Sequence, residues 1–180
     1  MIMPPLVRKS ALILHVTCSV GWFGAVATFL ALAVVGLTSQ DVQLVGAVYV
    51  AMDVITTLVI VPLSLASLLT GLIQSLGTRW GLFQHYWVVA KLLITVVSVI
   101  ILLTHTEGIR YMAGVAAAIP LASDDFPRLR FQLAVSAGAA LLALLLTTIL
   151  SVYRPRGLTP YGRRKQQGAR TEAPDGDIAI

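Results

Sequence analysis

The sequence is poor in charged residues and in cysteine. Only 12% of its 180 residues are Asp, Glu, Lys or Arg, whereas soluble domains carry about 25%, so the composition argues against a soluble protein. The single cysteine, Cys18, excludes a disulfide within the chain and is expected to be a small packing residue. The sequence also lacks a glycine-rich phosphate-binding loop, a His-Glu-x-x-His motif and a set of residues typical of a hydrolase active site. We therefore expect no catalytic site of a well-known class.

Long apolar runs dominate the chain instead. They cover residues 11–37, 44–76, 84–106 and 129–152, and each reaches the roughly 20 residues that a helix needs to cross a bilayer. The first run is longer than the core of a secretory signal peptide, which has about 7–15 residues. We therefore predict an all-α membrane protein in which residues 1–153 form a bundle of four transmembrane helices. Pro62 is expected to kink the second helix.

Two segments are too polar to span a membrane. Residues 107–128 contain Pro120, Asp124 and Asp125, and their apolar stretch is short, which predicts an interfacial segment between the third and fourth spans. Residues 154–180 are rich in Pro, Gly, Arg and Gln, which predicts a disordered basic cytoplasmic tail. Because this tail carries most of the net charge of +5, we expect no nucleic-acid partner. The expected partners are the lipid bilayer and either another membrane protein or a second copy of the chain.

The second and third runs carry polar and small residues at alternating steps of four and three. This spacing keeps them on one helical face, which in lipid must turn toward other helices or a water-filled cavity. We therefore expect the two spans to share an internal polar seam. The two series are Asp53, Thr57, Ile60, Ser64, Ser67, Gly71 and Gln74, and Gln84, Val88, Lys91, Thr95, Ser98, Leu102 and His105.

Lys91 is the most informative candidate, because an ammonium group inside a span costs about 3 kcal/mol. Three interpretations stay open: the side chain reaches the lipid headgroups, it is neutral, or it binds an anion such as a porphyrin propionate or a lipid phosphate. His15 is expected at a similar depth. It is either a haem or metal ligand or an interhelical hydrogen-bond donor. Trp22, about two helical turns further along the same span, is a third candidate for this cofactor site.

Asp53 and His105 are expected to approach each other near the outer surface, because both belong to the predicted seam and their helices run antiparallel. They are expected to bind a metal, to relay a proton or to form a partly hydrated ion pair. Met52 and Met112 could join them in binding copper, since thioether sulfur is a copper ligand. This pair is the basis of a metal-handling or metal-transport hypothesis.

Two stretches resemble known membrane bundles. Leu14-His15 followed by residues 21–25 (Gly-Trp-Phe-Gly-Ala) resembles the opening of the copper-resistance D and HemJ-type families. Residues 86–93 (Tyr-Trp-Val-Val-Ala-Lys-Leu-Leu) resemble the Trp-x-x-x-Lys-Leu pattern of HemJ-type proteins, and the whole chain is similar to four-span membrane proteins of actinobacteria. HemJ-type proteins are haem-binding protoporphyrinogen oxidases, so the resemblance implies haem held by His15 and Lys91. The second span does not match that family.

Three functions remain as hypotheses. The first is a multi-pass bundle without a catalytic site that binds a lipid, a small molecule or a protein partner. The second is a haem or porphyrin protein, as the resemblance implies. The third is copper or other metal handling through Asp53 and His105.

The basic residues predict a plasma-membrane topology with both termini in the cytoplasm. Nine of them lie on the amino-terminal side of the predicted spans and three on the other, which fits the positive-inside rule. The nine are Arg8, Lys9, Arg79, Arg154, Arg156, Arg163, Arg164, Lys165 and Arg170, and the three are Arg110, Arg128 and Arg130.

Alkaline-phosphatase fusions should be inactive at residue 180 and active within residues 118–124. An active fusion at residue 180 would overturn this topology.

Overall fold

The computed structural model describes residues 3–77, 84–118, 126–153, 157 and 159–164. Its elements are α1 (Pro5–Thr38), α2 (Val42–Ile55), the π-helical segment η1 (Thr56–Ile60), α3 (Val61–Gly77), α4 (Tyr86–Ala118) and α5 (Pro127–Tyr153). Because α2, η1 and α3 are continuous, the described residues contain four helical stretches that are long and apolar enough to cross a membrane. The prediction of an all-helical fold with four helices long and apolar enough to span a membrane is confirmed for the described residues, and it supports a multi-pass membrane protein.

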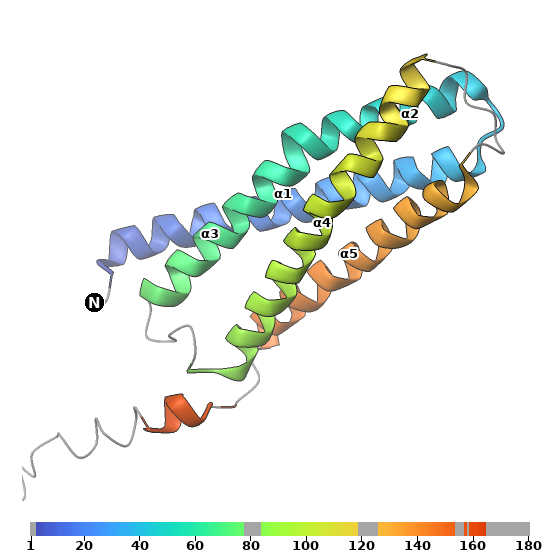
Figure 1. Ribbon diagram of the computed structural model, residues 1–180. Helices are drawn as coiled ribbons and strands as arrows, with labels where there is room; N and C mark the ends of the chain where they lie inside the picture. Colours follow the sequence, from blue (N-terminus) through green and yellow to red (C-terminus); the bar gives the residue numbers. More distant parts are fainter. Residues whose placement is uncertain (1–2, 78–83, 119–125, 154–156, 158, 165–180) are drawn as a thin grey trace, which may run out of the picture.

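The four stretches run in alternating directions, as Figure 1 shows. Along the bundle α1 packs against α3 and α5, and α2 packs against α4. The amide of Met3 donates to the carbonyl of Gly77 at 3.3 Å, and the amide of Tyr86 donates to the carbonyl of Gly157 at 3.4 Å. The start of α1, the end of α3, the start of α4 and the segment after α5 therefore meet at one end of the bundle, as an even number of spans requires.

The densest part of the core lies toward the opposite end. Tyr49 and Met52 of α2, Met112 of α4 and Leu133 of α5 are at most 2% exposed. The Tyr49 hydroxyl donates to the carbonyl of Gly36 in α1 at 3.4 Å. The two methionines considered for copper are thus packed within the apolar cluster that joins these helices.

The second span is irregular just before Pro62. The amide of Val61 donates to the carbonyl of Thr56, five residues earlier, which is the π-helical spacing. Pro62 has no amide hydrogen to donate, so a regular ladder cannot continue through it. The Thr56 hydroxyl donates to the carbonyl of Met52 at 2.7 Å, and the Ser64 hydroxyl donates to that of Val61 at 2.8 Å. The expected disturbance at Pro62 therefore takes the form of a π-helical turn.

This π-helical turn changes which residues face inward. One additional residue in a helical turn rotates the part of the helix before it relative to the part after it. Thr56 is 1% exposed, whereas Thr57, the residue of the predicted seam, is exposed. Ile60, Ser64 and Ser67, which lie at the end of the turn or beyond it, are buried as the seam predicts.

The third span differs from the expected boundary at residue 106. Helix α4 continues without a break through Glu107 to Ala118, because Gly108 and Gly114 lower helix propensity but do not stop a helix. Ile109 and Met112 are buried. The amino-terminal part of the expected interfacial segment is therefore a direct extension of the third helix. Residues 119–125 of the expected segment lie outside the described residues, and its last two residues, Pro127 and Arg128, belong to α5.

The expected disorder of the tail does not hold for residues 159–164. Residues 160–164 are helical, and the Thr159 hydroxyl accepts a hydrogen bond from the amide of Gly162 at 3.1 Å. Thr159 followed by Pro160 is a typical start of a helix, with an N-cap threonine and a proline at the first position. The amide of Thr159 donates to the carbonyl of Gln84 at 2.9 Å, which docks this turn against the start of α4. The other tail positions, 154–156, 158 and 165–180, lie outside the described residues.

Gly36 and Gly24 give a matched test of the packing between α1 and α2. A Cβ at Gly36 would lie 3.0 Å from Oη and 3.1 Å from Cζ of Tyr49, whereas a Cβ at Gly24 meets nothing within 4 Å. Gly36→Ala should lower the free energy of unfolding by about 1–3 kcal/mol, because Tyr49 must leave its packed position. Gly24→Ala should be neutral or stabilising, since alanine is the better helix former. Unfolding of both variants in detergent measures the difference, and equal stabilities would contradict this packing.

Candidate functional site

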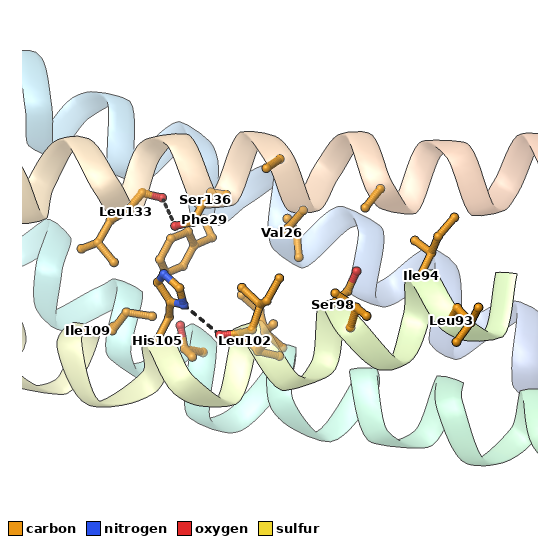
Figure 2. A pocket seen from close by; sticks show the side chains of 18 residues that line it. Val26, Phe29, Leu93, Ile94, Ser98, Leu102, His105, Ile109, Leu133 and Ser136 are labelled. Atoms are coloured by element: carbon orange, nitrogen blue, oxygen red, sulfur yellow. Dashed lines mark hydrogen bonds between the residues drawn. The ribbon is translucent and has the colours of Figure 1, made fainter. Parts of the chain in front are cut away.

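A groove runs along the side of the bundle between α4 and α5, and we call it the lateral groove (Figure 2). Its volume is about 440 Å³. One wall is α4 from Leu93 to Ile109. The other wall, on α5, consists of Leu133, Ser136, Ala137, Ala139, Ala140 and Ala143. The floor consists of Val26 and Phe29 of α1 with Thr56 and Ile60 of η1.

The groove exists because large side chains on α4 face small ones on α5. Four of the α5 positions in the wall are alanines, and an alanine side chain fills little of the space between two helices. Ile94 and Val97 on the opposite wall are too short to close the gap. A hydrogen bond from Lys91 to Ser151 and another between Gln132 and His105 join α4 to α5 on either side of the alanines.

His105 is a polar group toward one end of the groove, and the apolar side chains of Ile109 and Leu133 lie beyond it (Figure 2). Its Nδ1 lies 2.8 Å from the carbonyl oxygen of Ile101, and because a carbonyl can only accept, Nδ1 carries the hydrogen. The other ring nitrogen, Nε2, lies 3.4 Å from the side-chain amide nitrogen of Gln132. In the neutral ring Nε2 therefore accepts from Gln132. Ser136, which also lines this end, donates to the carbonyl of Gln132 at 2.6 Å.

His15 lies in a second polar cluster between α1 and α3. Its Nδ1 is 3.1 Å from the carbonyl oxygen of Ser67 and 3.1 Å from the hydroxyl of Thr70. The hydroxyls of Ser19 and Ser67 share a hydrogen bond of 2.8 Å. Gly71 leaves room for the ring, since a Cβ there would lie 3.1 Å from Cε1 of His15. His15 thus donates a hydrogen bond between helices, which is one of the two roles considered for it.

Lys91 is directed to α5. Its ammonium group donates to the hydroxyl of Ser151 at 2.6 Å, and it lies close enough to His15 to act electrostatically on the imidazole. The structure therefore brings Lys91 and His15 into one region, toward the end of the bundle where α1 and α4 begin and α5 ends. Trp22 is 3% exposed, and its indole nitrogen has no hydrogen-bond partner among the described residues. None of these three residues lines the lateral groove.

Asp53 and His105 are not joined by a hydrogen bond or an ion pair in the described part of the chain. Both ring nitrogens of His105 are engaged by α4 and α5, while Asp53 belongs to α2. Among the described residues no group of three or more His, Cys, Asp or Glu side chains is arranged to hold a metal ion. The metal hypothesis for this pair stays a prediction.

The polar partners supplied by α5 are the main part of the site that the sequence did not reveal. The predicted seam paired the second span with the third, whereas Lys91 and His105 bond to Ser151 and Gln132 of the fourth. Gln132 and Ser136 are four residues apart, so they share a helical face. The spacing of Gln132 and Ser136 could have indicated the polar face of α5, but two polar residues are a weak pattern in a helix of 27 residues.

Comparisons with protein-family models, with curated proteins and with solved structures find no match for this chain. The likeness of residues 14–25 and 86–93 to HemJ-type proteins therefore stays an expectation from those motifs.

The contact between Lys91 and Ser151 can be measured with a double-mutant cycle. Ser151→Ala should lower the free energy of unfolding by about 1–3 kcal/mol, because it leaves a partly buried ammonium without this acceptor. Lys91→Met should be neutral or stabilising, since it removes an insertion cost of about 3 kcal/mol. The double variant should resemble Lys91→Met alone. Additive effects of the two substitutions would show that the groups do not interact.

Proposed function

We propose that the protein binds the hydrocarbon chain of a lipid in the lateral groove. The observation that carries this proposal is a cavity of about 440 Å³ whose walls and floor are mainly Leu, Ile, Val, Phe and Ala side chains. Ligand sites typically have volumes of about 300–1,000 Å³ with mostly apolar walls and a few polar groups that fix orientation. The lateral groove has this character, with His105 and Ser136 together at one end.

The position of the groove favours a ligand that arrives from the bilayer. It lies between two helices that are each long and apolar enough to span a membrane, and the outward faces of both helices carry exposed apolar side chains such as Leu103 and Leu142. A hydrocarbon chain can enter sideways from such surroundings without passing through water. Inside, it gains dispersion contacts that an unfilled gap between helices would lack.

The π-helical segment is a second observation that supports a binding role for this region. Thr56 and Ile60, which begin and end η1, form part of the groove floor. Single π-helical turns within α-helices occur frequently at functional sites. Here the turn directs Thr56 inward, and its hydroxyl is satisfied by the carbonyl of Met52, so the floor presents mainly its methyl group.

The haem alternative is supported less well by the arrangement of the side chains. His15 has Nδ1 bonded to a backbone carbonyl and no hydrogen bond at Nε2 in the described part of the chain, an orientation that would suit a metal ligand. The groove, however, includes neither His15 nor Lys91, and Lys91 is engaged by Ser151. We therefore derive no chemistry through haem and favour lipid binding.

Ala140→Phe tests the groove by filling it. Ala140 lines the groove, so a phenylalanine side chain there should occupy the space of the ligand. The probe is hexadecanol with a diazirine in its chain, cross-linked to the purified protein in maltoside micelles. We expect mass spectrometry to place most cross-links of the wild type within residues 93–109 and 133–143, and Ala140→Phe to remove most of them.

The control is Ala31→Phe, the same substitution at an exposed position of α1 that does not line the groove. It should leave the labelling unchanged. Labelling spread evenly over the exposed apolar faces of α1 and α5, or equal labelling of Ala140→Phe and wild type, would overturn the proposal.

A further inference from the structure

Four polar side chains line the lateral groove, and none of them carries a permanent charge. They are Thr56, Ser98, His105 and Ser136. The other lining residues in the described part of the chain are Leu, Ile, Val, Phe or Ala. A charged group buried against such walls loses its hydration without gaining a counter-charge. The groove therefore suits a ligand whose buried part is uncharged.

Three of these side chains have already committed the hydrogen that they can donate. Thr56, His105 and Ser136 each donate to the carbonyl four residues earlier in the chain, at 2.7, 2.8 and 2.6 Å. A hydroxyl group has one hydrogen to donate, and the neutral ring of a histidine has one as well. These three side chains therefore offer a ligand lone pairs at most, and no hydrogen.

Ser98 is the exception among the four. Its hydroxyl has no hydrogen bond with another described residue, and Figure 2 shows its oxygen directed from α4 into the groove. Thr95, about one turn earlier, instead donates to the carbonyl of Lys91 at 2.9 Å. In an apolar environment a hydroxyl without a partner costs free energy. Among the described residues of the groove, Ser98 therefore has the one hydroxyl hydrogen that a ligand can accept.

Ser98 lies between two aliphatic parts of the α4 wall. It follows Leu93 by five residues and precedes Ile109 by eleven. At 1.5 Å per residue, the wall extends about 7.5 Å on one side of Ser98 and about 16.5 Å on the other. The lining side chains nearest to it in sequence are apolar, namely Ile94, Val97, Ile101 and Leu102. A group that accepts from Ser98 therefore has hydrocarbon surroundings in both directions, unlike the headgroup at the end of a lipid.

We infer that the lateral groove holds an uncharged lipid with a carbonyl group inside its hydrocarbon chain, and that this carbonyl oxygen accepts a hydrogen bond from Ser98. A carbonyl oxygen can only accept, which complements a site whose free group is a donor. A ligand hydroxyl would bring a hydrogen of its own into aliphatic surroundings. This inference rests on the proposed binding of a lipid chain in the groove and adds the chemical class of that lipid. The carbonyl belongs either to an ester of two long chains or to a long-chain ketone, and both present the same oxygen to Ser98.

Competition against the hexadecanol photoprobe tests the carbonyl. The competitors are dioctyl ketone, octyl nonanoate, heptadecane and heptadecanoate, which have the same number of carbon atoms. Cross-linking is measured within residues 93–109 and 133–143 of the full chain in maltoside micelles. We expect the ketone and the ester to compete about fivefold more strongly than heptadecane, the factor that one neutral hydrogen bond supplies. Ser98→Ala should remove this advantage and leave competition by heptadecane unchanged. Heptadecanoate should have no advantage over heptadecane, because its charged group gains no partner in the groove.

Ser136→Ala is the matched control. It removes a hydroxyl from the opposite wall, and that hydroxyl already donates to the carbonyl of Gln132 at 2.6 Å. This variant should retain the preference for the two carbonyl compounds.

Four results would overturn the carbonyl site while leaving the groove in place. They are equal competition by the ketone, the ester and heptadecane, a preference that Ser98→Ala retains, loss of the preference in both variants, and strongest competition by heptadecanoate. Absence of cross-links from the groove would instead overturn the proposed function itself. A preference for the ester alone or for the ketone alone, lost in Ser98→Ala, supports the site and identifies which lipid class supplies the carbonyl.

Discussion

The absence of an amide hydrogen at Pro62 is the constraint that shapes the floor of the lateral groove, through the π-helical turn at Thr56–Ile60. Pro62 cannot donate a backbone hydrogen bond, and in lipid the protein itself must satisfy each backbone polar group. The chain meets this constraint with the bond from Val61 to Thr56 and with hydroxyl groups that donate to nearby carbonyls. The same turn places Thr56 and Ile60 under the gap between α4 and α5. A backbone constraint imposed by one proline therefore shapes the floor of the candidate site.

Most hydroxyl groups in the spans hydrogen-bond to their own helix and do not connect helices. Thr95, Thr147 and Thr148 each donate to a carbonyl three or four residues earlier. The hydroxyl of such a residue is already hydrogen-bonded within its own helix, so its presence in an apolar run says little about which helix lies beside it. Helices are connected by longer polar side chains, namely His15, Lys91, His105 and Tyr49. The hydroxyl pair of Ser19 and Ser67 also connects two helices. Interhelical hydrogen bonds in membranes contribute about 0.6 kcal/mol on average, so these contacts fix orientation more than they add stability.

The sequence predicted the spans because the requirement for a long apolar run is local. It also placed the faces of α3 and of much of α4 correctly, since Ser64, Ser67 and Gly71 turn inward and Ser98, Leu102 and His105 line the groove. The sequence did not predict the features of the second and third spans that depend on more than the local apolar pattern. Pro62 predicts a disturbance in the second span, but not that the disturbance takes the form of a π-helical turn, which exchanges Thr57 for Thr56 on the inward face. The continuation of α4 to Ala118 depends on burial of Met112 against its neighbours, and no local signal marks that burial.

The groove itself was not predictable from the third span alone, because a cavity is a property of two facing surfaces. Leu93, Ile94 and Val97 would fill a tight helix contact if α5 met them with leucines. Instead α5 presents alanines over residues 137–143 and larger or polar residues beyond them. Bonds at Lys91–Ser151 and His105–Gln132 join the helices on either side of the alanines. Two helices that are joined at both ends and have small side chains between them leave a gap. In agreement with this gap, α4 has the smallest share of buried residues of the four spans. A lipid chain in this gap would supply the contacts that α4 lacks. Binding of the lipid would therefore stabilise the packing of α4 against the rest of the bundle.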